Sequence, residues 1–106
     1  MRNFDFFGAP LAGIVCMHRD LGPADAVSVG MYLQTLMLAL TARGRGTCVD
    51  VTVAGYPEVV RTELRISPEL TIICGLAVGY FDPDFPANKS HIGRDPVAKH
   101  VVFLDN

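Results

Sequence analysis

The sequence predicts an α+β domain in which a small β-sheet packs against one long, buried helix. Short apolar runs rich in β-branched residues indicate the strands, and one long segment with apolar side chains around its whole circumference indicates the helix. The chain has 106 residues, of which 50% are hydrophobic and 19% charged, a low charge for the large surface of so small a domain. We therefore expect residues 1–106 to form a single, incomplete domain whose apolar surface is covered by a second copy or by a missing part of the fold.

The first expected element is a buried strand over Leu11–Met17. It follows a phenylalanine-rich leading segment, Met1–Pro10. A short, continuous apolar run that contains Ile14 and Val15 and follows a proline is typical of a buried strand. The chain then breaks before Pro23.

The clearest expected element is a helix over Ala24–Arg43. Pro23 suits the first position of a helix, and Asp25 in the first turn favours its positive end. Gly44 predicts the end of the helix. At about 100° per residue the apolar side chains leave no polar face, so this helix must be buried on all sides. They include Val27, Val29, Met31, Tyr32, Leu33, Leu36, Met37, Leu38 and Leu40.

Three further elements complete the expected core. Thr47–Val53 predicts a short strand or extended segment, because it alternates weakly and is rich in β-branched residues. Pro57–Leu64 predicts a short amphipathic helix. Leu70–Tyr80 is apolar on both sides, as a central strand should be. A proline-containing loop, Asp82–Pro86, follows it, and Val101–Leu104 predicts a terminal strand with no obvious partner inside the chain.

Charge and hydropathy exclude several function classes. The net charge is −2 and no basic stripe is present, so we expect no nucleic-acid partner. The longest apolar runs, Met31–Leu40 and Leu70–Phe81, fall short of the ~20 residues that a bilayer span requires. No targeting segment is visible. We expect a soluble, cytoplasmic protein without a membrane partner.

The metal-ligating residue types predict no metal site. The sequence has three cysteines at wide spacing, which is not a disulfide framework. Cys16 and His18 lie two residues apart, but no third ligand follows at a useful spacing. His18-Arg19-Asp20-Leu21 matches the start of a kinase catalytic loop by chance, because no glycine-rich phosphate loop or metal-binding motif accompanies it.

One cationic cluster permits two interpretations. Lys89, His91 and Arg94 occur within a short polar stretch. On composition alone the cluster is a solvated loop. Alternatively it is an anion site, because Lys and Arg supply the charge that a phosphate needs.

Several phrases in a fixed order along the chain resemble the nitroreductase-like flavoenzymes. Any one phrase is weak, but their succession over essentially the whole chain is specific. The phrases are Phe6-Phe7-Gly8-Ala9-Pro10, Gly30-Met31-x-Leu33-Gln34-x-Leu36-Met37-Leu38-Ala39, Ala42-Arg43-Gly44-x-Gly46-Thr47-Cys48, Glu63-Leu64-x-Ile66, Ile73-Cys74-Gly75-Leu76-Ala77-Val78-Gly79-Tyr80, Pro86-Ala87-Asn88-Lys89 and Ile92-Gly93-Arg94-x-Pro96-Val97.

The resemblance covers only the C-terminal part of the nitroreductase-like fold. It implies that the Ala24–Arg43 helix forms the core of a homodimer, with FMN at the interface. It also implies that the terminal strand, Val101–Leu104, reaches over the partner subunit. Members of the family carry an N-terminal Arg-Ser-x-Arg-like motif that grips the FMN phosphate, and nothing in this sequence matches that motif.

The resemblance also assigns six cofactor-binding positions. The backbone of Thr52, Val53, Ala54 and Gly55 is similar to the segment that runs along the isoalloxazine ring, where main-chain hydrogen bonds tune the flavin. Lys89 corresponds to one phosphate-binding cation. The second, usually arginine, falls on His91, whose neutral imidazole is a weaker phosphate partner.

The implied function is that of an FMN-dependent NAD(P)H oxidoreductase of the nitroreductase type. NAD(P)H reduces the flavin, and a small-molecule acceptor, nitroaromatic or quinone-like, then takes the electrons. The flavin performs the chemistry, so we assign no catalytic residue. Two alternatives stay open: a non-catalytic α+β dimerisation or binding protein that has lost the flavin, and a flavin site completed by a separate chain.

Overall fold

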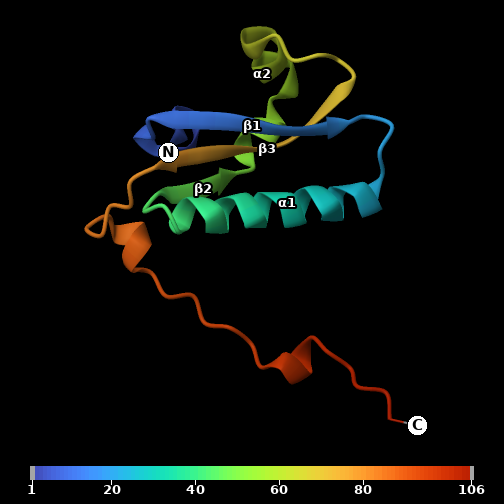
Figure 1. Cartoon of the computed structure of the whole chain (residues 1–106), viewed down its shortest axis with the longest axis vertical. Helices are drawn as coiled ribbons and strands as arrows, with labels where there is room; N and C mark the ends of the chain where they lie inside the picture. The colour runs from blue at the N-terminus through green and yellow to red at the C-terminus, as the bar shows by residue number, and fades with distance from the viewer. Residues whose placement is uncertain (1, 106) are drawn as a thin grey trace.

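The computed structural model describes residues 2–105 and has three antiparallel strands with two α-helices (Figure 1). The strands form one sheet in the order β1-β3-β2. Short 3-10 turns, labelled η, lie between and after these elements. The elements are η1 Asn3–Gly8, β1 Leu11–His18, α1 Pro23–Thr41, β2 Gly46–Asp50, η2 Thr52–Gly55, α2 Pro57–Leu64, β3 Leu70–Gly79, η3 Pro86–Lys89 and η4 Val97–Lys99.

Strand β3 is the centre of the sheet, as its apolar sequence predicts. It pairs with β1 from Leu11 opposite Val78 onward, and with β2 from Gly46 opposite Gly79. A register shift between Val15 and Cys16 marks an irregularity in β1. Both faces of a central strand are covered, so the buried core gathers on β3. Its buried hydrophobic members are Ile72, Cys74, Leu76 and Ala77.

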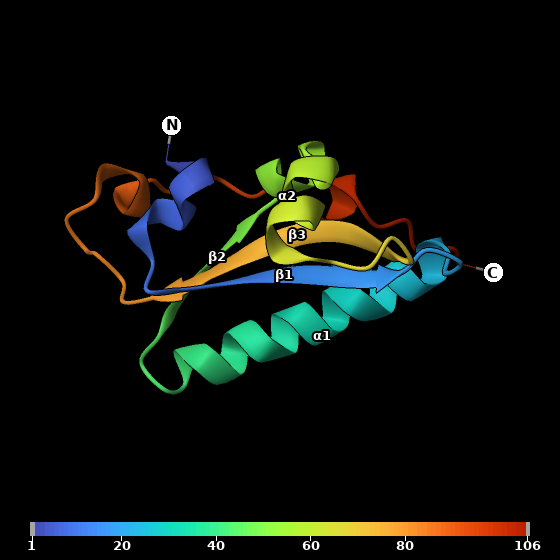
Figure 2. The same ribbon diagram turned by 90° about the horizontal axis from the view of Figure 1, so that it is seen from above.

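The sheet separates two layers (Figures 1 and 2). Helix α1 lies along one side, and α2 lies on the other with η2. Turn η1 packs against η2 and β3, so the leading segment shares this second layer.

Helix α1 begins one residue before its predicted start at Ala24 and ends two residues before its predicted end at Arg43. The backbone N–H of Gly22 donates to Asp25 Oδ2 at 2.9 Å, which satisfies one free group of the first turn. Beyond the helix, Gly44 has a φ of +71°, a left-handed conformation that glycine adopts without steric cost. The N–H of Arg45 donates to the carbonyl of Leu40 at 3.0 Å and closes the helix end.

The expected burial of α1 is not achieved within this chain. None of its residues is buried, and Met31 and Leu38 keep 61% and 60% of their surface exposed. The reason is that a three-stranded sheet covers only one side of the helix. By length and composition α1 also passes a test for a membrane-crossing helix, as core helices of soluble proteins do. Within the described residues, nothing covers the outer apolar surface of α1.

Two expectations for extended segments are wrong in part. Strand β2 ends at Asp50, and the following residues form the 3-10 turn η2 instead of continuing to Val53. Val101–Leu104 forms no strand: the chain after β3 runs away from the sheet, and Leu104 is 88% exposed (Figure 1). A strand requires a neighbouring edge for its backbone hydrogen bonds, and the tail meets none within the described residues.

Gly75 lies where the core has no room for a side chain. A Cβ at this position would be 2.7 Å from Cε1 of Phe6 and 3.2 Å from Cγ2 of Val53. We expect Gly75→Ala to lower the free energy of unfolding by ~1–3 kcal/mol in urea denaturation, since overpacking forces these side chains apart. Gly13→Ala is the matched control, because a Cβ on Gly13 meets nothing within 4 Å. Equal stabilities of the two variants would contradict this packing.

Candidate functional site

The turn η2, assigned to the flavin ring by sequence, is held by several hydrogen bonds. The N–H of Thr52 donates to Asp50 Oδ1 at 2.9 Å, and Asn3 Nδ2 donates to Thr52 Oγ1 at 2.9 Å. The N–H of Ala54 donates to the Val51 carbonyl at 3.1 Å. These bonds tie the turn to β2 before it and to η1, which is far away in the sequence.

The four residues of η2 differ in their access to solvent. Val53 is 6% exposed and packs into the core, whereas Gly55 is exposed. Thr52 and Ala54 are half-buried. Val53 therefore anchors the turn, while the backbone around Gly55 is open to a ligand.

The two phosphate-binding candidates lie apart from this turn. Lys89 ends η3 and His91 follows it in the extended C-terminal segment, and both are exposed. Lys89 Nζ lies 3.5 Å from Asp84 Oδ1. Figures 1 and 2 place η3 beyond the end of the sheet, away from α2 and the turn before it. The described residues thus do not bring together the ring-binding and phosphate-binding positions.

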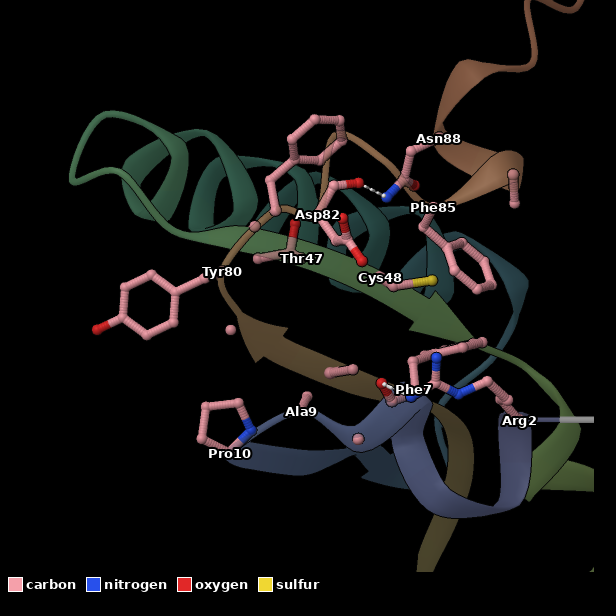
Figure 3. Close-up of a pocket in the computed structure, with 16 residues that line it drawn as sticks. Arg2, Phe7, Ala9, Pro10, Thr47, Cys48, Tyr80, Asp82, Phe85 and Asn88 are labelled. Carbon is pink, nitrogen blue, oxygen red and sulfur yellow. Dashed lines mark hydrogen bonds between the residues drawn. The ribbon is translucent and has the colours of Figure 1, made fainter.

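A cavity of about 460 Å³ lies between η1, one end of the sheet and the loop after β3 (Figure 3). None of the six sequence-assigned positions lines it, although Asn88 adjoins Lys89. Its walls combine aromatic side chains with polar groups of both charges. They include Arg2, Phe7, Cys48, Tyr80, Phe81, Asp82, Phe85 and Asn88.

Arg2 contributes positive charge to this cavity. Its guanidinium donates to the carbonyl of Phe7 at 3.0 Å and lies 5.6 Å from the centre of the Phe85 ring. Across the cavity, Asn88 Nδ2 donates to the carbonyl of Asp82 at 2.8 Å (Figure 3). An aromatic lining with a cation suits a flat, anionic or electron-rich group.

A second cavity, of about 450 Å³, is almost wholly apolar. It lies between η1 and α2, where the rings of Phe4 and Tyr56 meet edge to face with centroids 5.6 Å apart. Val53 is the one sequence-assigned position that lines it. This cavity offers hydrophobic contact and little to orient a polar ligand.

Sequence reasoning missed the aromatic walls of the larger cavity. The phenylalanines near the start of the chain and the aromatic residues after β3 are visible in the sequence as two separate clusters. Their meeting depends on the antiparallel pairing of Leu11 with Val78, which brings the start of β1 beside the end of β3. The two aromatic clusters are therefore visible in the sequence, but the strand register that brings them together is not.

Burial raises the pKa of all three thiols above the ordinary value of 9.0. For Cys48 and Cys74, the negative charge of Asp50 adds to the effect of burial on the pKa. For Cys16, the charge of Arg61 opposes it. Among the described residues, no cluster of three His, Cys, Asp or Glu side chains has the arrangement of a metal site.

These shifts predict a loss of stability in alkaline solution. A group whose pKa is raised in the folded state favours folding below its unfolded pKa, and this contribution disappears as pH rises through the folded pKa. We expect the thiol contribution to the free energy of unfolding to be constant well below pH 9.0 and to fall as the pH rises through 9.0 and above. Urea denaturation between neutral and alkaline pH measures it. Cys74→Ala should show a shallower fall, and identical slopes for the two proteins would contradict the prediction.

A comparison with known proteins identifies the family. The model of the Nitroreductase family matches residues 2–80, which is most of the chain. The chain belongs to the nitroreductase family. A 4-nitrobenzoate reductase from Nocardioides sp. strain LMS-CY is 37% identical over 103 residues, which are 97% of this chain and 42% of that protein.

Solved nitroreductase structures share the fold described above. The FMN- and NADPH-dependent nitroreductase NfnB from Sphigopyxis sp. strain HMH matches with a TM-score of 0.93 and 30% identity, over 99% of this chain and 47% of that one. The FMN-dependent nitroreductase NfnB from Mycobacterium smegmatis, in complex with NADPH, matches with a TM-score of 0.89 and 29% identity, over 98% and 46%. The nitroreductase chain described here therefore spans less than half the length of these relatives.

Proposed function

We propose that this chain carries part of the flavin site of an FMN-dependent NAD(P)H oxidoreductase of the nitroreductase type. The acceptor is a nitroaromatic or quinone-like small molecule. The observation that carries the proposal is the match of nearly the whole chain, at a TM-score of 0.93, to an FMN- and NADPH-dependent nitroreductase. Under this proposal the 106 residues supply one portion of a larger active site.

The described residues offer FMN two separate sets of contacts. The backbone of Thr52–Gly55 would border the isoalloxazine ring, and its exposed end at Gly55 leaves room for a flat group. Lys89 and His91 would hold the phosphate. Their exposure, and the weak contact of Lys89 with the exposed Asp84, leave both side chains able to turn toward an anion.

When bound, FMN would supply the redox chemistry between the nicotinamide and the acceptor. The residues of this chain would bind the flavin and orient it. Val53 anchors the ring-binding turn in the core. No acid, base or nucleophile of this chain is assigned a proton transfer.

We further propose a cytoplasmic homodimer in which α1 of one copy covers α1 of the other. The support is the uncovered apolar surface of α1. Cys16, Cys48 and Cys74 are free, as cysteines are in a reducing compartment.

A non-catalytic dimerisation protein is the second candidate. It is favoured by the separation of Lys89 and His91 from the turn η2, since a phosphate and a ring of one FMN must be held together. Under this candidate, α1 still mediates association, but no flavin binds.

Turnover separates the two candidates. The purified chain, supplied with FMN, is mixed with NADPH and 4-nitrobenzoate, and NADPH oxidation is followed by absorbance. The proposed function predicts acceptor-dependent oxidation above that of free FMN with the same reagents. Oxidation no faster than that of free FMN, at every protein concentration tested, would favour the non-catalytic candidate.

His91→Arg should strengthen FMN binding. A guanidinium can donate two parallel hydrogen bonds to a phosphate and stays charged at neutral pH, unlike imidazole. We expect a gain in affinity of about ten-fold in a flavin fluorescence titration. His100→Arg, with the same change at another exposed tail position, should leave the affinity unchanged. An equal gain in FMN affinity for the two variants would show that the affinity depends only on the net charge of the chain.

A further inference from the structure

Asp50 is the one polar side chain that is fully buried among the described residues, at 2% exposure. Its Oδ1 accepts the hydrogen bond from the N–H of Thr52 at 2.9 Å. Its Oδ2 is shielded from solvent and has no hydrogen-bond partner in the part of the chain that the structure describes. Burying a carboxylate with one oxygen unpaired destabilises a fold, so such a group calls for an explanation.

The position of Asp50 explains the role of its bonded oxygen, Oδ1. It is the last residue of β2 and pairs with Gly75 in the sheet, directly before η2. Strand β2 must stop there for the 3-10 turn to begin. Aspartate side chains commonly fix such turns by accepting the N–H two residues ahead, and Asp50 does so at Thr52.

Close packing around Gly75 of β3 also confines the turn η2. A Cβ at Gly75 would lie 2.7 Å from Phe6, 3.2 Å from Val53 and 3.5 Å from the Asp50 carbonyl. The turn is therefore pressed between η1 and β3, and its direction depends on the hydrogen bond at its start. Without that bond, the N–H of Thr52 would lose its partner. The backbone up to Gly55 would then lose its fixed orientation.

We propose that Asp50 is a positioning residue for the flavin-binding turn Thr52–Gly55. Its Oδ1 orients the turn backbone, and through it the main-chain groups that border the isoalloxazine ring. Asp50 itself touches no flavin in this account. The inference rests on the proposed function for its flavin part, whereas the control of the turn by Asp50 stands on the hydrogen bond alone.

Two substitutions separate hydrogen bonding from packing. Asp50→Asn keeps an acceptor oxygen for the Thr52 N–H in a side chain of the same shape, whereas Asp50→Leu keeps the branching of the side chain, with a larger volume, and has no acceptor. Ile72→Val, in the buried core of β3, is the control for a general loss of stability. Circular dichroism selects the conditions in which all four proteins are folded.

The first readout needs no flavin. Amide hydrogen exchange of the apo chain should be faster at Thr52, Ala54 and Tyr56 in Asp50→Leu than in the wild type, and near wild type in Asp50→Asn and Ile72→Val. The second readout is FMN affinity by fluorescence titration. We expect Asp50→Leu to bind about ten-fold more weakly and Asp50→Asn to stay within about three-fold of wild type.

The outcomes distinguish this inference from the proposed function. Unchanged exchange at the turn in Asp50→Leu overturns the inference, as does a loss of FMN affinity that Ile72→Val shows equally. If the wild type binds no FMN while Asp50→Leu exchanges faster at the turn, the proposed function is contradicted and control of the turn by Asp50 is upheld.

Discussion

Replacing Met31 and Leu38 with lysine should convert the chain from a self-associated species to a monomer. Both side chains are more than half exposed on α1, and so are Val27 and Tyr32. Apolar surface of this extent associates in water, at about 25 cal/mol for each Å² buried. Two lysines would place charges in that interface with no partner, a cost of several kcal/mol. Sedimentation velocity at micromolar concentration measures the change.

Glu58→Lys is the matched control for this experiment. It changes the net charge of the chain from −2 to 0, as the two lysines do, but on α2, on the other side of the sheet from α1. We expect it to sediment as the wild type does. A wild-type chain that is a monodisperse monomer at micromolar concentration would contradict the association through α1. A monomeric Glu58→Lys would show that net charge, and not the α1 surface, governs association.

Lys89→Ala should weaken the binding of FMN by about ten-fold and leave the binding of riboflavin, which lacks the phosphate, nearly unchanged. The expected effect follows from removing a charge-assisted hydrogen bond to phosphate. It lies at the lower end for such bonds, because Lys89 is exposed and solvent screens its charge. Fluorescence titrations with the two flavins, at two salt concentrations, measure the difference.

Lys99→Ala controls for the loss of one positive charge in the tail. Lys99 is as exposed as Lys89 and also contacts a single aspartate, Asp95, at 3.1 Å. We expect it to bind both flavins as the wild type does. Equal weakening by Lys89→Ala and Lys99→Ala, or equal weakening of FMN and riboflavin by Lys89→Ala, would contradict a phosphate contact at Lys89.

The sequence predicts most of the core, because hydrophobic periodicity and turn residues are local signals. The first strand, the long helix, the short helix and the central strand all lie within two residues of their expected bounds. The end of β2 could not be predicted in this way, because the turn at Thr52 depends on a hydrogen bond to a buried Asp50. The conformation of the tail could not be predicted either. Val101–Leu104 is apolar enough for a strand but meets no sheet edge within the described residues.

The candidate site is less predictable than the fold. The family resemblance assigns Thr52–Gly55 and Lys89 by motif, and the arrangement of these residues around FMN remains a proposal. Composition gave no indication of the cavity lined by Arg2 and Phe85, because its walls come from opposite ends of the chain. Asp50 was equally hidden: a single aspartate in a sequence is expected at the surface, and only the fold shows it buried.

The central claim is that this chain carries part of an FMN site. Its most direct test is the visible absorbance spectrum of the purified chain after FMN has been added and the excess removed by gel filtration. The account predicts a flavin band that co-elutes with the protein and is weakened in Lys89→Ala. A protein fraction without any flavin band, from folded and associated wild-type chain at high FMN concentration, would contradict it.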